Sequence, residues 1–231
     1  MSSLNPRLLI LASGTKDGGG SGLEKIIEHA LVDNLSVDIV GIVSNHESGG
    51  VRQIADKYQL PFYHMVGPFD GQAYTAVLNS FKPDFIVLSG WLKKTIGLPP
   101  NVTINIHPAL LPKFGGPGLY GHYAHEAVIA AFECGEVTQS GVTMHFVTEV
   151  YDAGPRFFEF RVPLVKGDTA ETLYEKKIKP AEHGWQWFII RLVITHDIYW
   201  SGVPGEPVIV PAWYYDLPIC PESTDDNCII T

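Results

Sequence analysis

The sequence predicts an α/β fold in three layers, with a mostly parallel twisted sheet between helices on both of its faces and an irregular C-terminal arm. Two observations support this prediction. Short segments rich in β-branched and aliphatic residues alternate with stretches of helical apolar spacing, as in proteins built from parallel strands. In addition, 45% of the 231 residues are hydrophobic, which is enough to bury one large core.

The expected elements follow one another in chain order. Strands are predicted at residues 7–12, 37–44, 61–64, 85–89 and 103–107, with the clearest connecting helix over 23–31. A helix over 123–134, strands over 141–148 and 157–164, and a long terminal helix over 169–194 come next. Thr169 suits the N-cap of that last helix, with Thr172 at the capping-box position. Because ligands of such sheets bind at the carboxyl ends of the strands, we expect the chemistry in the loops there.

The chain is expected to form one domain over residues 1–195 and a C-terminal extension over 196–231. The extension is expected to pack on the domain or to be partly disordered, with frayed residues at 222–227. Its prolines and aromatic residues mark the change in pattern: Pro204, Pro207, Pro211, Pro218, Pro221, Trp200, Trp213, Tyr214 and Tyr215.

Composition favours small-molecule partners. A net charge of -9 and a pI near 5.4 disfavour nucleic acid or an anionic membrane as the main partner, because both bind clustered Lys and Arg. The first residues lack the apolar run of a signal peptide or membrane span, so we expect a cytoplasmic protein. We also expect a monomer or a homodimer. Cys134, Cys220 and Cys228 form no close pair, which argues against disulfides and a cysteine zinc site.

A glycine-rich loop, residues 13–22, separates the first strand from the first helix. Glycines let backbone N–H groups approach an anion, and a helix N-terminus attracts negative charge, so this loop is of the phosphate-cradle type. It matches neither the dinucleotide-binding nor the P-loop spacing. Taken alone, it is equally consistent with a plain flexible connection.

The segment 101–112 contains Asn105 and His107, two residues apart on a predicted strand and therefore on one face of it. An amide that donates to a developing oxyanion, beside an imidazole that carries a proton near neutral pH, suits acyl transfer. On spacing alone, polar groups satisfied at a strand end are the more common explanation.

The segments INIHPALLP (104–112) and GVTMHFVTEVYDAGP (141–155), together with the glycine loop, closely resemble the phosphoribosylglycinamide formyltransferases over residues 8–194. Their fold is Rossmann-like. The Asn-x-His-Pro and Leu-Leu-Pro elements also occur in methionyl-tRNA formyltransferase and formyltetrahydrofolate deformylase, so they indicate the chemistry better than the acceptor. Glycinamide ribonucleotide as acceptor is favoured by the blocks at 118–126, 142–147 and 180–183.

The resemblance implies catalytic roles for three residues. Asn105 would donate to the formyl oxygen, His107 would stabilise charge and move protons, and Asp152 would hold the imidazole and a water. Since a nearby carboxylate raises the pKa of an imidazole, we expect Asp152 to raise that of His107. Without the resemblance, Asp152 before Ala153-Gly154 reads as an ordinary turn aspartate.

The resemblance also implies two binding regions. The acceptor phosphate would lie on Gly20, Ser21 and Gly22, with Lys179 and Glu182 nearby, and Lys16 would assist from a segment, 15–19, that looks inserted. Folate would contact the side chains Trp91, Leu92, Lys93, Val147 and Tyr151, with Lys93 replacing an arginine that is absent after Asp70. His145 would line the site or act behind it, although a core histidine is the more common case.

The reaction implied is formyl transfer from 10-formyltetrahydrofolate, the co-substrate, to the amine of glycinamide ribonucleotide in purine biosynthesis. His122 and His125 have helical spacing but no third ligand at a fitting distance, so we expect no metal. Alternatives left open are another amine acceptor such as a sugar nucleotide, a deformylase, and an inactive folate- or nucleotide-binding module.

Overall fold

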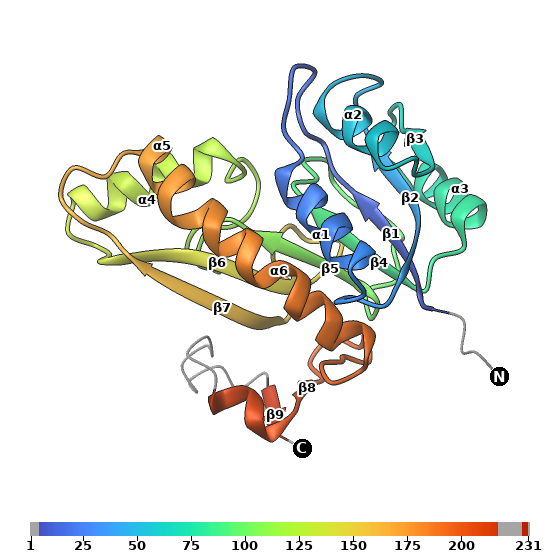
Figure 1. Ribbon diagram of the computed structural model, residues 1–231. Coiled ribbons are helices and arrows are strands. Elements are labelled where there is room, and N and C mark those ends of the chain that lie inside the picture. The colour runs from blue at the N-terminus through green and yellow to red at the C-terminus, as the bar shows by residue number, and fades with distance from the viewer. Residues whose placement is uncertain (1–4, 217–227, 231) are drawn as a thin grey trace.

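The computed structural model describes residues 5–216 and 228–230, and it contains a seven-stranded sheet with helices on both faces (Figure 1). The strand order is β3-β2-β1-β4-β5-β6-β7, in which β1 to β5 are parallel, β6 pairs antiparallel with β5, and β7 pairs antiparallel with β6. The predicted three-layer, mostly parallel α/β fold is confirmed.

The strands are β1 (Arg7–Leu11), β2 (Asp38–Ser44), β3 (Phe62–His64), β4 (Phe85–Ser89), β5 (Thr103–His107), β6 (Gln139–Phe146) and β7 (Arg156–Pro163). The helices are α1 (Ser21–Leu31), α2 (Gly50–Lys57), α3 (Gly71–Phe81), α4 (His122–Glu133), α5 (Ala170–Leu173) and α6 (Lys179–Ile194). A π-helical turn, η1 (Tyr174–Ile178), joins α5 to α6, so the predicted long terminal helix is continuous but not uniform.

The terminal helix begins where the sequence predicted. The Thr169 hydroxyl accepts a hydrogen bond from the N–H of Thr172, and the Thr172 hydroxyl accepts one from the N–H of Thr169. Threonine therefore completes a capping box in which glutamate is the usual partner, because its hydroxyl reaches the same backbone donor.

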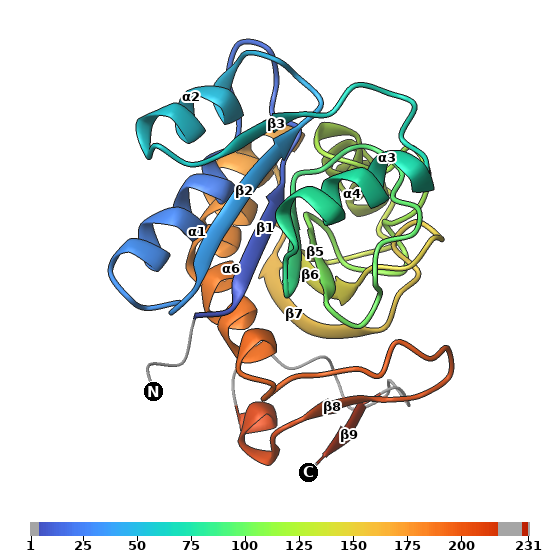
Figure 2. The ribbon, with the colours of Figure 1, turned by 90° about the vertical axis from the view of Figure 1, so that its right-hand side faces the viewer.

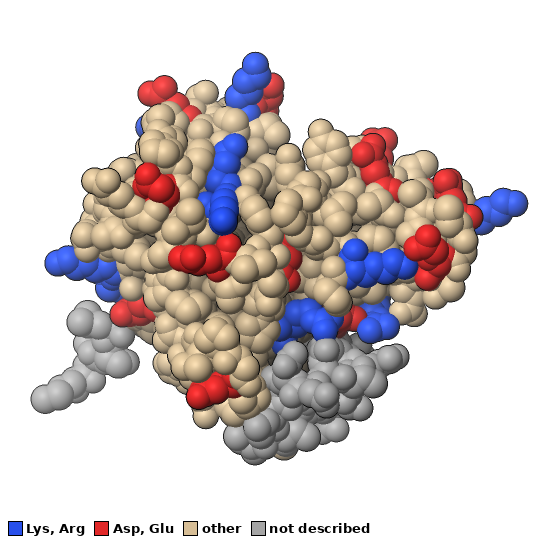
Figure 3. Space-filling model, turned by 180° about the vertical axis from the view of Figure 1, so that it is seen from behind, with Lys and Arg blue, Asp and Glu red and all other residues tan. Residues whose placement is uncertain are grey.

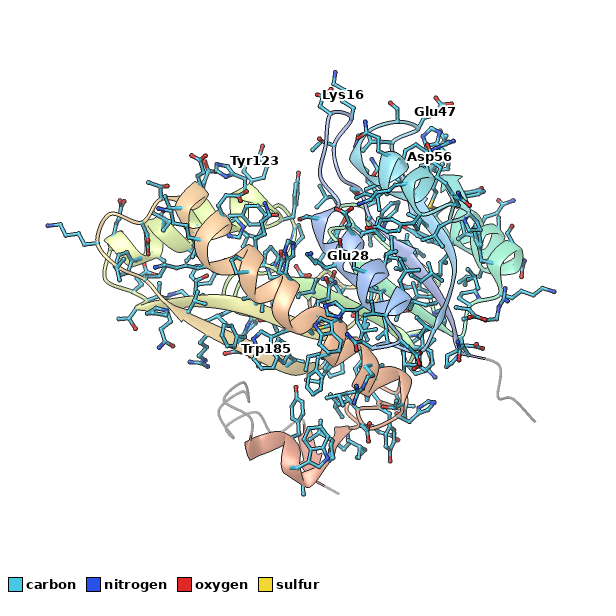
Figure 4. The ribbon with its side chains drawn as sticks, viewed as in Figure 1. Lys16, Glu28, Glu47, Asp56, Tyr123 and Trp185 are labelled. Carbon is cyan, nitrogen blue, oxygen red and sulfur yellow. The ribbon has the colours of Figure 1, made fainter. Side chains whose placement is uncertain are left out.

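The sheet buries side chains on both faces, as a doubly covered parallel sheet requires. Leu8 and Ile10 of β1 belong to a large core shared with α1, α2 and α6, whereas Leu9 and Leu11 pack with α3 on the opposite face (Figure 2). On the other part of the sheet, Trp185 of α6 points toward β7 (Figure 4), where its ring packs against Phe158 and Phe160. These layers hold the carboxyl ends of the parallel strands in fixed positions.

Charged side chains of both signs are interspersed on the face seen in Figure 3. Within the described residues, no helix is both long enough and apolar enough to cross a membrane.

The C-terminal arm is more regular than expected. It contains two short paired strands, β8 (Val208–Val210) and β9 (Cys228–Ile230), and a 3₁₀ helix over Ala212–Asp216. The frayed end expected at 222–227 lies outside the described residues.

Side chains of the arm pack into the main core. Trp200 is 4% exposed, and its ring lies 5.7 Å from that of Phe146 on β6, between ring centroids. The buried Tyr214 hydroxyl donates a 2.6 Å hydrogen bond to the carbonyl of Phe157 on β7. We propose that the described part of the extension is a structural part of the formyltransferase domain predicted over residues 1–195.

Replacing Trp200 with alanine should destabilise the protein by about 3–5 kcal/mol, the usual cost of removing a large buried aromatic side chain. Urea denaturation measures this, with Trp213→Ala as the matched control because Trp213 is 44% exposed. The control should lose less than about 1 kcal/mol. Equal losses in the two variants would contradict an integral role for the arm.

Candidate active site

A cavity of about 630 Å³ opens at the carboxyl ends of β1, β4 and β5. The loops that the sequence singled out form its walls, which agrees with the rule for parallel sheets. Residues with polar or chemically active groups on these walls include Thr15, Ser21, Ser89, Asn105, His107, Tyr120, His122, His125, Tyr151, Asp152, Glu171, Tyr174, Glu175, Glu182 and Gln186.

The antiparallel pairing of β5 with β6 places Asn105 opposite His145. His145 Nδ1 lies 2.8 Å from the carbonyl oxygen of Phe146, which can only accept, so this nitrogen carries a proton. In the neutral ring, His145 Nε2 is then an acceptor, and it receives a 3.1 Å hydrogen bond from Asn105 Nδ2. His145 thus orients the Asn105 amide, and it lies behind the cavity wall.

His107 is 4% exposed, and its Nε2 donates a 2.7 Å hydrogen bond to the carbonyl oxygen of Phe114. That bond leaves Nδ1 as the nitrogen that faces Asp152, with 3.7 Å between Nδ1 and Oδ1. Burial lowers the pKa of His107 below its ordinary value, although Asp152 and the Phe114 carbonyl each act to raise it. Asp152 thus acts in the expected direction, but loss of hydration outweighs it, and the net shift of the His107 pKa is downward.

Asp152 follows a turn and has a positive φ of 52°, a conformation that aspartate tolerates better than most residues. Its Oδ2 accepts a 2.9 Å hydrogen bond from the N–H of Gly116, and its Oδ1 lies 3.5 Å from His145 Nε2. Burial acts to raise the pKa of Asp152, but the neighbouring imidazoles of His145 and His107 and the Gly116 N–H lower it overall. The site therefore contains a carboxylate between two imidazoles.

Gly20, Ser21 and Gly22 line the cavity where α1 begins. The first N–H groups of a helix have no partner within it, and the helix dipole makes this end electropositive. The Ser21 hydroxyl is held 3.2 Å from His183 Nε2. These features suit the anion cradle that the sequence predicted, which stays a prediction.

The apparent insertion before the cradle is a small hairpin, closed by a bridge between Thr15 and Gly18. Lys16 lies at its tip and points away from the rest of the molecule (Figure 4). Thr15 lines the cavity but Lys16 does not, so the proposed assistance from Lys16 has no support in this geometry.

Two predicted residues of the terminal helix differ in their relation to the cavity. Glu182 lines it, and burial raises the pKa of this carboxyl to about 7. Lys179 stands beside it, where its Nζ pairs with Glu175 Oε2 at 2.9 Å. Glu175 and Tyr174 of the π-helical turn line the cavity themselves, and the sequence analysis did not identify them.

The residues expected to bind folate line the main cavity and a smaller cavity, both of which also contact Asn105 and Asp152. Leu92 and Tyr151, each 40% exposed, line the main cavity together with the more buried Trp91, whose Nε1 donates to the Tyr74 hydroxyl at 3.0 Å. Lys93 and Val147 line a smaller adjoining cavity of about 50 Å³ that also contacts Asn105, His145 and Asp152.

The histidines considered as metal ligands have other partners. His122 Nε2 lies 3.1 Å from Glu126 Oε1, and the buried His125 ring packs against that of Tyr174. Across residues 5–216 and 228–230, no three His, Cys, Asp or Glu side chains are grouped so that they could hold a metal ion.

The arrangement is suited to acyl transfer. An oriented amide donor, an imidazole and a carboxylate lie together, and the backbone N–H groups at the start of α1 line the same cavity. Such a site can bind a phosphate-bearing amine, stabilise a tetrahedral oxyanion and move protons between nitrogen atoms. No Ser or Cys nucleophile is needed for that reaction.

Comparison with known proteins agrees with this chemistry. The formyl transferase family model matches residues 7–192. The chain is 35% identical over 200 residues to the chloroplastic phosphoribosylglycinamide formyltransferase of Arabidopsis thaliana, covering 81% of this chain and 67% of that protein. The corresponding Vigna unguiculata protein is 33% identical over 202 residues, with 81% of this chain and 62% of that protein covered.

Among solved structures, glycinamide ribonucleotide transformylase 1 from Symbiobacterium toebii superposes with a TM-score of 0.73. It is 27% identical in sequence, and the match covers 86% of this chain and 92% of that one. The family match extends over most of the chain and includes every predicted catalytic residue. The chain therefore belongs to the formyl transferase family, among the phosphoribosylglycinamide formyltransferases.

Proposed function

We propose that this protein transfers the formyl group of 10-formyltetrahydrofolate to the amine of glycinamide ribonucleotide, and that Asn105, His107 and Asp152 catalyse the transfer. The observation that carries the proposal is that these three residues lie close together and line the same cavity as the cradle at Gly20 to Gly22. Family membership identifies the reaction class, and the cradle favours an acceptor that carries a phosphate.

In the proposed reaction, the acceptor amine attacks the formyl carbon and forms a C–N bond. The formyl oxygen becomes an oxyanion, which accepts a hydrogen bond from Asn105 Nδ2. His107 Nδ1, unprotonated in the neutral ring, takes a proton from the attacking nitrogen, and Asp152 stabilises the imidazolium that forms. That proton passes to the folate nitrogen as its bond to the formyl carbon breaks, so the proton balance closes.

The acceptor phosphate would lie on the backbone of Gly20, Ser21 and Gly22. Glu182 would contact the sugar, and because its raised pKa of about 7 leaves it only partly ionised near neutral pH, it would repel the phosphate less than an ordinary glutamate does. Lys179 would either leave its ion pair with Glu175 and bind the phosphate, or contact both groups at once. Each of these contacts places an acceptor group so that the amine faces Asn105 and His107.

The folate would occupy the end of the cavity bounded by Trp91, Leu92 and Tyr151, with Lys93 and Val147 in the adjoining smaller cavity. Folate at this end would present its formyl group beside Asn105 and Asp152, which both cavities share. The proposal also includes a cytoplasmic location and a monomeric or homodimeric state.

Replacing Asp152 with asparagine should lower kcat about 10²- to 10⁴-fold while KM for both substrates changes little, because the carboxylate stabilises the imidazolium only during proton transfer. Absorbance of the folate measures formyl transfer to glycinamide ribonucleotide, with the exposed Tyr123→Phe as the control variant. His107→Ala should be similarly inactive. Wild-type turnover that releases formate without a formylated product would instead indicate a deformylase.

Replacing Glu182 with glutamine should stabilise the protein more at pH 8 than at pH 5. The folded-state pKa of about 7 lies above the ordinary 4.5, so wild-type stability falls as pH rises from about 4.5 through 7. Glutamine removes this dependence, and each pKa unit corresponds to about 1.4 kcal/mol, so we expect a gain of about 1–3 kcal/mol at pH 8. Urea denaturation at both pH values measures it, with the exposed Glu171→Gln as control. If the variant and the wild type differed in stability by the same amount at both pH values, the raised pKa of Glu182 would be contradicted.

A further inference from the structure

Gln186 of α6 has an amide group that the fold leaves incompletely paired. The residue is 2% exposed, and among the described residues its Nε2 has no hydrogen-bond partner. Its Oε1 makes only a long contact of 3.5 Å with the Ser89 hydroxyl. A buried donor without an acceptor costs about 1–3 kcal/mol, so a role beyond packing is indicated.

This amide group lines the main cavity directly beside the anion cradle. A Cβ atom placed on Gly22 would lie 2.8 Å from Ser89 Oγ and 3.3 Å from Gln186 Oε1. The missing side chain at Gly22 is therefore what lets both polar groups approach the first turn of α1. Ser89, 7% exposed at the end of β4, and Gln186 together form a polar floor under the cradle.

Gln186 lies four residues after Glu182, so both side chains project from the same face of α6. Both line the cavity, and α6 packs against α1 (Figure 1). A residue with only a packing role at this position would be apolar, like the buried Ile189 and Ile190 that follow it. The face of α6 that meets the cradle is instead polar over two successive turns.

We propose that Gln186 is a specificity-determining residue for the acceptor, with its amide nitrogen donating a hydrogen bond to an oxygen of the acceptor's sugar-phosphate group. The inference rests on the proposed function, because that function places a sugar-phosphate at this end of the cavity. An N–H₂ donor selects oxygen acceptors, either a sugar hydroxyl or a phosphate oxygen. The terminal amide torsion is soft, so the group can turn toward a ligand at little cost.

Replacing Gln186 with methionine keeps the size of the side chain and removes both hydrogen-bonding atoms. We expect KM for glycinamide ribonucleotide to rise about 5- to 30-fold, while kcat and KM for 10-formyltetrahydrofolate stay within about twofold. The exposed Gln53→Met is the matched control and should leave all three values unchanged. Thermal denaturation without substrate should show no loss of stability, because an unpaired buried amide has been removed. An unchanged acceptor KM, or a loss shared equally between both substrates, would overturn the proposal.

Calorimetry with ribose 5-phosphate and with inorganic phosphate tests the same contact without any turnover. Weaker binding of ribose 5-phosphate alone by the methionine variant identifies a sugar oxygen, and weaker binding of both probes identifies a phosphate oxygen. Equal affinities in wild type and variant for both probes would refute the inference. If the wild type binds ribose 5-phosphate through Gln186 but fails to transfer formyl groups, the proposed function falls and the binding role of Gln186 stands.

Discussion

The antiparallel pairing of β6 with β5 is the interaction on which the candidate active site depends. The five preceding strands run parallel to one another. In contrast, β6 runs in the opposite direction and places His145 beside Asn105 of β5. The chain then turns at the end of β6 and returns through Asp152 to the same imidazoles. A one-residue slip of this register would move His145 to the other face of the sheet and leave Asn105 without its acceptor.

Burial then sets the protonation of the groups that the strands bring together. Loss of hydration disfavours whichever form is charged, so it lowers the pKa of His107 and raises that of Glu182, and both groups tend toward neutrality near pH 7. Asp152 is the exception because it accepts a hydrogen bond from the Gly116 N–H and lies beside two imidazoles. Its charge is therefore kept where a positive charge develops on His107, and the raised pKa of Glu182 reduces the negative charge on the acceptor side.

The central strands and the shared face of Asn105 and His107 could be predicted from sequence because both depend on local periodicity, whereas the roles of these residues and of Asp152 were implied only by the family resemblance. Residues 85–89 and 103–107 were predicted with the bounds that β4 and β5 have, and alternation along β5 places Asn105 and His107 on one face as expected. The direction in which the pKa of His107 shifts could not be predicted, since it depends on how deeply the ring is buried. Gln186 was missed because one glutamine among apolar residues carries no signal until α1 and β4 are seen against it. The regular elements of the arm were missed because its prolines and aromatic residues are equally common in loops.

Several of these features lower stability where they occur. Asp152 has a positive φ, Glu182 resists ionisation, and the amide nitrogen of Gln186 lacks an acceptor. A fold tolerates such local costs only if the surrounding structure fixes them, here through a fully apolar core on both faces of the sheet and the arm that covers β7. All three costs fall on the walls of one cavity. Such a concentration of costs is typical of a binding and catalytic site. A ligand that supplies the missing partners recovers the free energy as affinity, so selection for function retains these residues.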